Sequence, residues 1–154
     1  MTSLDLQLSF DGQLLCGDLT RSGADLAVDD SLATAVIVSL FTDQRVDLSE
    51  VPDDQARRRG WWGDMLAGDV ITPSDQIGSR LWLLRREKQT EETRRRAQEY
   101  CAQALEWLLE DKLVIRITVS TAWTERGVLG IDIGLQLPDG RDLTYRYHQA
   151  VGGA

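Results

Sequence analysis

The side chains that most often carry out catalysis are few in this sequence and far apart. The 154-residue chain has one histidine, His148, and two cysteines, Cys16 and Cys101, without CxxC or Cys/His spacing. A Ser/His/Asp triad has no base other than His148 to use. The pattern GxxxxGK[ST] of phosphate-binding loops is absent. We expect both cysteines to be reduced and structural, and we expect no metal and no cofactor.

Carboxylates near tryptophans are the candidates for hydrolytic chemistry. A glycosidase needs two carboxyl groups across a cleft, with the pKa of one raised by an apolar wall. Asp43, Asp64, Asp69 and Asp75 lie near tryptophans in a stretch that reads as a loop. In a chain with 25 acidic residues most carboxylates are solvated or cap helices. We therefore predict no catalytic residue, and we keep a peptidoglycan-cleaving, lysozyme-like enzyme as the alternative function.

Residues 57–64, RRRGWWGD, combine cations with two adjacent indoles. Such a patch can bind single-stranded nucleic acid, because arginines track phosphates and indoles stack on bases. Tryptophan and arginine are also enriched among binding hot spots of protein interfaces. We prefer the second interpretation and predict a partner-binding site at Trp61, Trp62, Gly63 and Asp64, with one indole facing the core and the other a neighbour.

A second basic cluster, residues 94–96, does not change this preference. These three arginines lie near Glu91, Glu92 and Glu99 at helical spacing, where ion pairs on a solvated face explain them. The whole chain has 25 acidic and 17 basic residues, a formal charge of −8, which repels a phosphate backbone. We therefore expect no nucleic-acid partner.

Length and composition indicate one domain. A chain that is 42% hydrophobic and 27% charged over 154 residues can bury one core and is short for two. Its first residues, MTSLDLQLSFDG, are acidic where a signal peptide needs basic residues. No apolar run approaches the roughly 20 residues of a membrane span. We expect a soluble protein, made in a cytosol, without a membrane span.

The elements that must position these residues begin with helices. Residues 4–8 alternate as in a short strand of an N-terminal arm, 1–28, which continues into a turn-rich segment around Asp11, Gly12, Gly17 and Asp18. Asp29, Asp30 and Ser31 are typical helix caps, and they precede the apolar run LATAVIVSLF. The composition of residues 42–73, rich in acids, arginines and glycines, is typical of a long loop. A short helical segment follows at SRLWLLRR, and a long amphipathic helix spans residues 90–110, with an N-terminal signature at Thr90.

The last third of the chain changes from helical to strand periodicity. Leu113, Ile115, Ile117 and Val119 alternate with polar residues, and the same pattern repeats in residues 129–137 and 143–147. Turns at 125–127 and 138–140 separate the three segments. The sequence predicts a single α+β domain, with a helical part at 29–110 followed by a C-terminal three-stranded antiparallel meander at 113–148.

Several segments together resemble one known family. The segments are GDLTRSGADLAVDDSLATAVIVSLFTDQR, RRGWWGD, GSRLWLLRREKQTEE, YCAQALEWLLED and LPDGRDLTYRY. The chain resembles the Mu-like phage baseplate proteins, within the wider contractile-tail group of sheath-initiator or "lysozyme-like" wedge proteins. The likeness covers nearly the whole chain, and RGWWGD followed by GSRLWLL is its most specific part.

The resemblance implies a structural subunit of a phage or prophage tail, present in several copies around the tail axis. Such a subunit joins larger baseplate wedge proteins to the tail tube and the first sheath layer. In the wider group the helices pack with wedge proteins, and the terminal sheet accepts a strand from the sheath protein. The implied location is the virion tail baseplate, after synthesis and assembly in the host cytoplasm. The resemblance carries over no catalytic residue.

Further partner-binding residues follow from the resemblance. Asp43 and Arg45 stand where the wider group has a turn ending in Gly-Glu-Arg, so the arginine is matched and the acid is shifted. We expect Arg45 to pair with a carboxylate of its own chain or of a partner.

The last strand supplies the remaining candidates. Leu143, Tyr145 and Tyr147 mark an edge strand whose unpaired backbone groups can accept another strand. Arg141 and Arg146 would keep that edge soluble before assembly. The wider group has Glu-Pro-Arg before its first sheet strand, whereas this chain has Glu110-Asp111-Lys112.

Overall fold

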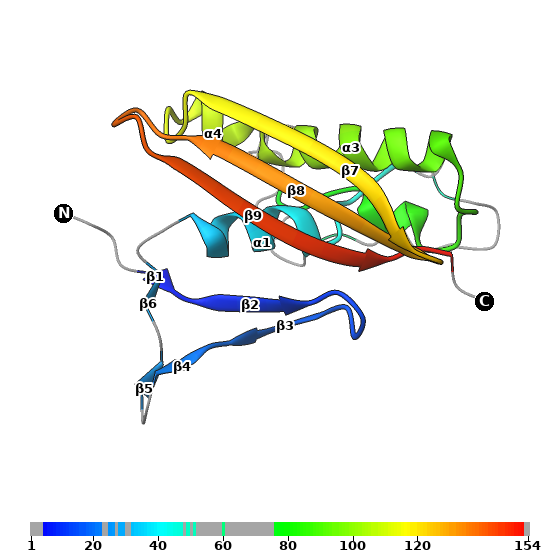
Figure 1. The fold of residues 1–154 in the computed structure, drawn as a ribbon, viewed down its shortest axis with the longest axis horizontal. Helices are drawn as coiled ribbons and strands as arrows, with labels where there is room; N and C mark the ends of the chain where they lie inside the picture. Colours follow the sequence, from blue (N-terminus) through cyan, green and yellow to red (C-terminus); the bar gives the residue numbers. More distant parts are fainter. Residues whose placement is uncertain are drawn as a thin grey trace.

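The computed structural model describes residues 5–22, 25–26, 28–29, 32–47, 49, 51, 60 and 76–152. Within them, one layer of helices covers one face of a three-stranded antiparallel sheet, and small hairpins project below this body (Figure 1). The mixed α+β class and the C-terminal meander predicted from the sequence are confirmed.

The sheet consists of β7 (Arg116–Glu125), β8 (Val128–Gln136) and β9 (Asp142–Ala150), with β8 in the centre. The inward side chains Leu129, Ile131, Ile133 and Leu135 of β8 are at most 1% exposed, as their alternation predicted. Complete burial of one such side chain stabilises a fold by about 1.5–3 kcal/mol. The central strand is therefore the base of the core, and both outer strands are edges.

The start of the first sheet strand was predicted wrongly. Leu113 and Ile115 are 41% and 59% exposed, Val114 is buried instead, and the strand begins at Arg116. The reason is the sharp turn after the helices. Lys112 has a left-handed φ of 59°, and the N–H groups of Leu113 and Val114 both donate to the carbonyl of Leu108. This turn shifts the inward positions by one residue.

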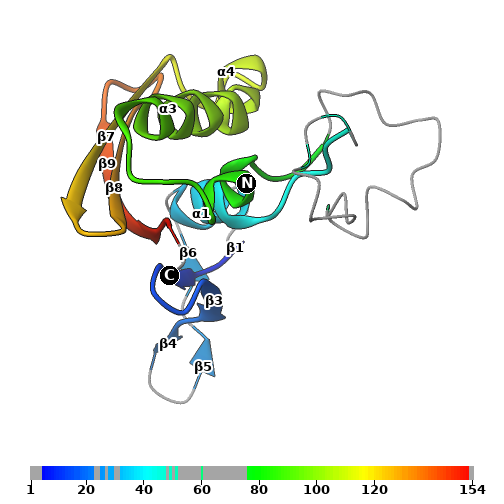
Figure 2. The same ribbon diagram turned by 90° about the vertical axis from the view of Figure 1, so that its right-hand side faces the viewer.

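The long helix forms as α3 (Glu91–Leu105), with a short continuation, α4 (Trp107–Glu110), after a break at Glu106. The predicted cap at Thr90 is confirmed, since its hydroxyl accepts the N–H of Thr93 at 3.1 Å. The apolar stripe is buried: Ala97, Cys101, Leu105 and Leu108 are each 0% exposed. This stripe packs on the sheet on the side of β7 (Figure 2).

The central helix α1 (Ala33–Phe41) lies beside α3 in the same layer, and Val36, Ile37 and Leu40 are buried. The acidic cap predicted for it is wrong. Its N-cap is Leu32, with no side-chain hydrogen bond, and Asp29 belongs to strand β6 (Val28–Asp29), which pairs with β1 (Asp5–Leu6). Pairing keeps the backbone extended at Asp29, where a helix cap was expected.

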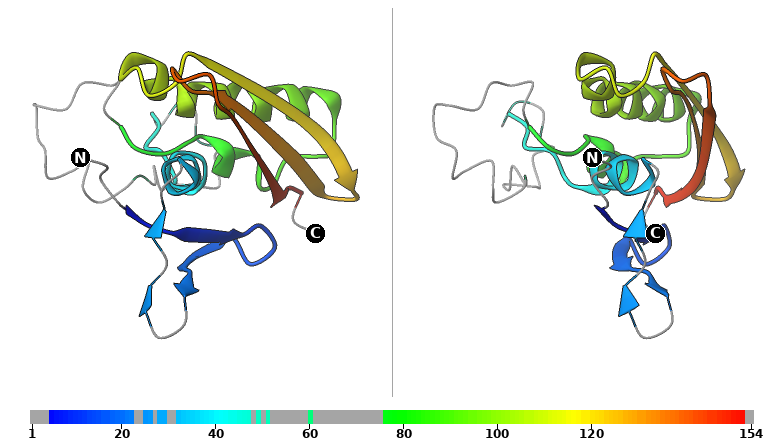
Figure 3. Two further views of the ribbon diagram at one scale, coloured as in Figure 1. Left: turned by 60° about the vertical axis from the view of Figure 1, so that its left-hand side comes forward. Right: turned by 90° about the vertical axis from the view of Figure 1, so that its left-hand side faces the viewer.

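The short segment predicted at SRLWLLRR is a single 3-10 turn, η4 (Leu81–Leu84), and all four of its side chains are buried. In the N-terminal arm, β2 (Leu8–Asp11) pairs with β3 (Cys16–Leu19), and β4 (Arg21–Ser22) pairs with β5 (Asp25–Leu26). Gly17 and Asp18, expected in a turn, lie in β3. Figure 3 shows these hairpins projecting from the body.

Candidate functional site: an open sheet edge

Strand β9 forms one edge of the sheet, and its register shows which backbone groups face outward. The N–H of Leu137 donates to the carbonyl of Arg141 at 2.9 Å, and the N–H of Val151 donates to that of Gly127 at 2.8 Å. Antiparallel ladders alternate hydrogen-bonded and non-hydrogen-bonded pairs. The odd-numbered residues of β9 therefore bond to β8, and the even-numbered residues direct their N–H and C=O groups to the edge.

The outward groups at the C-terminal end of β9 are covered by the N-terminal arm. The N–H of Ala150, an even-numbered residue, donates to the carbonyl of Gly12 at 3.3 Å. Gly12 lies so close to His148 that a Cβ there would overlap the carbonyl oxygen of His148. Among the residues that the structure describes, no hydrogen bond engages the outward backbone groups of Asp142, Thr144 and Arg146. This half of β9 is an open template for strand addition.

Three predicted site residues, Leu143, Tyr145 and Tyr147, lie on the inner face of β9 and are half-buried. Tyr147 packs edge-on against Phe41 of α1, with ring centroids 5.3 Å apart, and Phe41 stacks on Phe10 of the N-terminal arm at 3.6 Å. These side chains therefore anchor β9 to the helices. The backbone groups available to a partner belong to the intervening residues, chiefly Thr144 and Arg146. Sequence alternation finds such residues only when the register with β8 is known.

Two arginines near this edge are held by neighbouring acids. Arg146 donates through Nε to Asp132 at 2.5 Å, and Arg141 donates to Asp139 at 2.7 Å. The hydrogen bond to Asp132 raises the pKa of Arg146. The backbone N–H and then the side chain of Arg141 lower the pKa of Asp139. The charges predicted to keep the edge soluble are thus present beside it, on exposed side chains.

Asp43 and Arg45 belong to the turn after α1. Asp43 forms a parallel bridge with Ser79, the N–H of Gln44 donates to the carbonyl of Ser79 at 2.9 Å, and Arg85 lies 3.5 Å from the Asp43 carboxylate. Among the described residues no carboxylate pairs with Arg45, whose Cβ instead lies next to Gly60. Asp43 pairs with Arg85, and the ion pair expected for Arg45 with a carboxylate of its own chain or of a partner stays a prediction.

The remaining candidates, Trp61, Trp62, Gly63 and Asp64, lie outside the described residues, as do Asp69 and Asp75. Of the carboxylates considered for a glycosidase pair, Asp43 is described, and its partner is Arg85. The arginines of α3 form the predicted ion pairs: Arg94 with Glu91, and Arg95 with Glu92 and Glu99. These bonds lower the pKa of Glu91 and Glu92.

Within the described ranges, no cluster of three or more His, Cys, Asp or Glu side chains can hold a metal ion. In the same ranges, no helix has both the length and the apolar character to span a bilayer.

The two thiols have opposite environments. Cys16 is exposed in β3, whereas Cys101 is 0% exposed in the core. Burial raises the pKa of Cys101 to about 12. The thiolate is the reactive form of cysteine. Cys101 is therefore protected from reagents in two ways, because solvent cannot reach it and because its thiol stays protonated.

We expect one thiol per chain to react rapidly with a disulfide reagent at pH 8, and the second to react only when the protein unfolds. A Cys16→Ser variant should then show no rapid reaction in the native state and one thiol in denaturant. Two rapidly reacting thiols in the native wild-type protein would contradict the burial of Cys101.

Comparison with known proteins relates the chain to phage baseplate proteins. The family model described as "Phage protein GP46" matches residues 32–142. "Baseplate protein gp46" of Escherichia phage Mu is 44% identical over 138 residues, which cover 89% of this chain and 91% of that protein. "Mu-like prophage FluMu protein gp46" of Haemophilus influenzae is 40% identical over 124 residues, covering 80% of this chain and 82% of that protein.

Proposed function

The chain belongs to the GP46 family of phage proteins, and from this premise we infer that it is a structural protein of a phage tail baseplate. The family match includes α1, both later helices and most of the sheet, so the likeness covers the core. The relative from phage Mu is named for the baseplate.

The finer proposal concerns what the subunit joins. We propose that it links larger wedge proteins to the tail tube or sheath of a contractile tail, in several copies around the tail axis. The observation that supports this is the open half of β9, where Asp142, Thr144 and Arg146 present unpaired backbone groups beside charges that keep the edge soluble. An extended segment of a tube or sheath protein can pair there, gaining backbone hydrogen bonds without needing a pocket.

The helical side of the molecule is proposed to meet the wedge proteins. Asp43 and Arg45 lie on the turn that follows α1, at an intermediate level of exposure that permits contact with a partner. Trp61, Trp62, Gly63 and Asp64 remain a proposal from the sequence alone, since tryptophan and arginine are typical interface anchors.

The alternative function, a peptidoglycan-cleaving enzyme, has less support. The names of the two relatives describe a baseplate protein and a prophage protein and mention no hydrolase. Asp43, a carboxylate considered for that role, lies 3.5 Å from the guanidinium of Arg85, an arrangement unlike the apolar pocket that holds a glycosidase acid. We therefore propose a structural role without catalysis.

Strand addition to β9 is tested by Thr144→Pro. The N–H of Thr144 points away from β8, so proline removes an outward donor without breaking the sheet ladder, and edge strands tolerate it. We expect the amount of this variant in purified tail particles to fall about tenfold, which corresponds to about 1.4 kcal/mol. This amount is measured by quantitative mass spectrometry of tail particles made in the presence of wild-type or variant protein.

The matched control is Thr144→Ala, which changes the same exposed side chain but keeps the N–H. It should enter tail particles at the wild-type level. Thermal unfolding of both variants shows whether the sheet is intact. Normal incorporation of a folded Thr144→Pro protein would reject strand addition at β9. Absence of the wild-type protein from tail particles would reject the baseplate assignment itself.

A further inference from the structure

The N-terminal arm is a part of the structure to which the family likeness assigns no role. Its hairpins β2–β3 and β4–β5, with the pair β1–β6 at their base, project away from the helices and the sheet (Figure 3). The matched family model begins at residue 32, where the arm has ended. The role of the arm therefore has to follow from its own residues.

One face of the β2–β3 hairpin is bound to the rest of the molecule. Residues paired across two strands share a face, so Leu8, Phe10 and Leu19 lie on the same side. On this side Phe10 stacks on Phe41 of α1, with ring centroids 3.6 Å apart. The N–H of Leu8 donates to the hydroxyl of Thr34 at 3.1 Å. These contacts hold the hairpin against α1 and determine which face points outward.

The opposite face, called here the outer hairpin face, is exposed and acidic. It consists of Ser9 paired with Asp18 and of Asp11 paired with Cys16, and all four residues are exposed. Among the residues that the structure describes, no cation pairs with either carboxylate. The outer hairpin face therefore presents two charges that no described side chain neutralises.

The net charge of the protein is concentrated in the arm. Residues 1–31, the arm and the residues that lead to α1, contain six acidic side chains and one basic side chain. This fifth of the chain therefore carries five of the eight net negative charges. Like charges close together repel and destabilise a compact unit, whereas acids on the sheet are neutralised locally, as Asp132 is by Arg146. A cationic surface placed against the arm would relieve this repulsion.

The turn at the tip of the hairpin places an exposed leucine beside the outer hairpin face. Oδ1 of Asp11 accepts the N–H of Gln13 at 2.8 Å and that of Leu14 at 3.0 Å. The bonds to Leu14 and then to Gln13 lower the pKa of Asp11, so its charge persists below neutral pH. Leu14 is 75% exposed, whereas Leu15 has a left-handed φ of 53° and is half-buried. Strain of this kind persists only where the surroundings hold it, so the position of Leu14 is fixed.

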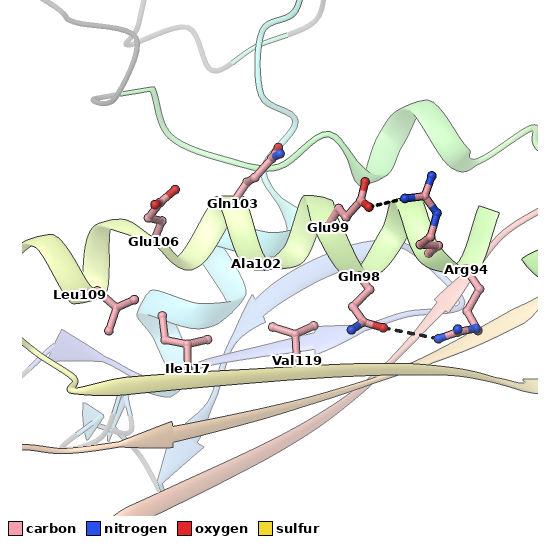
Figure 4. Close-up of a pocket in the computed structure, with 10 residues that line it drawn as sticks. Arg94, Gln98, Glu99, Ala102, Gln103, Glu106, Leu109, Ile117 and Val119 are labelled. Atoms are coloured by element: carbon pink, nitrogen blue, oxygen red, sulfur yellow. Dashed lines mark hydrogen bonds and ion pairs between the residues drawn. The ribbon is translucent and has the colours of Figure 1, made fainter. Parts of the chain in front are cut away.

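Two kinds of occupant are unsuited to this surface. Nucleic acid carries the same sign of charge as the arm. A second copy of the chain has the same net charge of −8, and the arginines of its α3 are used within the chain. Arg94 donates to Gln98 at 3.4 Å, and Arg95 pairs with Glu99 at 2.7 Å, the two bonds drawn in Figure 4. The outer hairpin face therefore fits a different protein with a basic surface.

We propose that the outer hairpin face binds a basic surface of another tail protein. Lysine or arginine side chains of that protein lie opposite Asp11 and Asp18, and an apolar recess receives Leu14. The charges orient the two surfaces and speed their encounter, and burial of the leucine adds affinity. The contact uses side chains of the arm and no backbone group of the sheet. It is therefore independent of strand addition to β9, although it rests on the baseplate role.

Cys16 is a natural reporter for this contact, because its exposed thiol lies on the outer hairpin face beside Asp11. The isolated protein and purified tail particles are each treated with N-ethylmaleimide, and mass spectrometry follows the alkylated fraction of the peptide that contains Cys16. We expect the thiol to react at least about tenfold more slowly in tail particles, because the bound partner excludes the reagent. In the isolated protein, the reaction rate should not depend on protein concentration.

Removal of the two charges tests whether the partner is basic. Combined Asp11→Asn and Asp18→Asn keeps the side-chain oxygens that accept backbone N–H groups, so the hairpin should be retained. We expect incorporation into tail particles to fall about fivefold, the effect of losing two exposed ion pairs. The matched control combines Glu106→Gln and Glu110→Gln, which removes two exposed charges around α4, far from the arm (Figure 1). This control should enter tail particles at the wild-type level.

Leu14→Ala tests the apolar recess. Because Leu14 is 75% exposed, its truncation should leave the melting temperature of the isolated protein unchanged. Incorporation into tail particles should nevertheless fall at least about fivefold, as expected for loss of an interface anchor. The control is Leu14→Met, which keeps an apolar side chain of similar size and should be incorporated normally.

Protection of Cys16 in tail particles together with loss of both variants supports the proposal. A Cys16 thiol that reacts equally fast in tail particles and in the isolated protein overturns it. Normal incorporation of the charge variant or of Leu14→Ala also overturns it, and so does equal loss of the charge variant and its control, since net charge would then be the cause. Protection of Cys16 in the concentrated isolated protein would assign the face to a second copy instead. Absence of the wild-type protein from tail particles would overturn the baseplate role itself, which is a different result from all of these.

Discussion

Replacement of Gly78 by alanine should reduce the free energy of unfolding by about 2–4 kcal/mol, a large part of the stability of a domain of this size. Gly78 has a φ of +111°, a conformation that costs an ordinary residue about 1–2 kcal/mol. In addition, an alanine Cβ would overlap the carbonyl oxygen of Thr42 and lie 2.9 Å from the nitrogen of Gln44. Both are backbone atoms, which cannot turn away as a side chain can.

The overlap would affect the contact between the turn after α1 and the segment that leads into η4. The N–H of Ser79 donates to the carbonyl of Thr42 and that of Gln44 to the carbonyl of Ser79, both at 2.9 Å. The hydroxyl of Ser79 donates to the carbonyl of Leu40 at 2.5 Å, and the indole N–H of Trp82 donates to the carbonyl of Gln44. Displacing Thr42 would strain this whole set. The turn that carries Asp43 and Arg45 would therefore be altered as well.

Gly140 is the matched control for this prediction. It also has a positive φ, +87°, but no atom lies within 4 Å of the Cβ position. Gly140→Ala should cost the backbone strain alone, about 1–2 kcal/mol. Urea unfolding, monitored by tryptophan fluorescence, gives the free energy of unfolding of both variants. If the two variants lose the same free energy of unfolding, the backbone at Thr42 can move enough to accept a methyl group. The packing argument for Gly78 would then be wrong.

The sequence predicts an element well where local chemistry and periodicity agree. The helix α3 was predicted from the Thr90 cap and from an apolar stripe, and both depend on residues close together in sequence. Strand β8 was predicted from strict alternation, because it is central and its inner face is completely buried. In such elements the surroundings add little to the local preference.

The errors have two causes, a distant contact and an unusual backbone conformation. Asp29, Asp30 and Ser31 have the composition of a helix cap, but Asp29 pairs with Asp5 in a strand, and such a contact lies outside any window of neighbouring residues. Leu113 and Ile115 continue an alternating pattern, but the turn at Lys112 places Val114 inward instead. That turn is local, and it depends on a left-handed φ that a lysine seldom adopts.

The candidate site also has one part that local sequence signals predict and another that depends on distant contacts. Alternation located β9 and its three inward side chains, because that signal is local. The open backbone groups of Thr144 and Arg146 depend on the register with β8. The ion pair of Arg94 with Glu91 was predictable from helical spacing, whereas the bond of Arg94 to the carbonyl of Thr121 depends on how α3 lies on β7.

Gly12 in the N-terminal arm gives the second large effect. An alanine Cβ there would overlap the carbonyl oxygen of His148 and lie 2.5 Å from its carbonyl carbon. The turn of the hairpin must then leave β9, although the hairpin stays attached to α1 through Thr34, whose hydroxyl accepts the N–H of Leu8 at 3.1 Å. We expect the amide of Ala150, now without its acceptor, to exchange at least about tenfold faster than in the wild-type protein.

Loss of this cover also lengthens the open edge. In the wild-type protein the turn ends the open half of β9 before His148, so a partner strand can pair along Asp142 to Arg146 and no further. Gly12→Ala extends the free edge to Ala150. Longer uncovered edges promote pairing between molecules. The Gly12→Ala variant should therefore self-associate more than the wild-type protein at the same concentration. Analytical sedimentation over a range of concentrations measures this difference.

The control for this effect lies in the same hairpin. A Cβ at Gly17 of β3 would lie 2.8 Å from Cδ2 of Leu8, the far end of a flexible side chain that can move aside. Gly17→Ala should therefore keep both the slow exchange of Ala150 and the wild-type association. If the two glycine variants behave alike, contact with β9 does not hold the hairpin turn, and the limit on the length of an added strand must come from the partner. If Gly12→Ala alone uncovers Ala150, a single glycine in the N-terminal arm sets how much of β9 another protein can use.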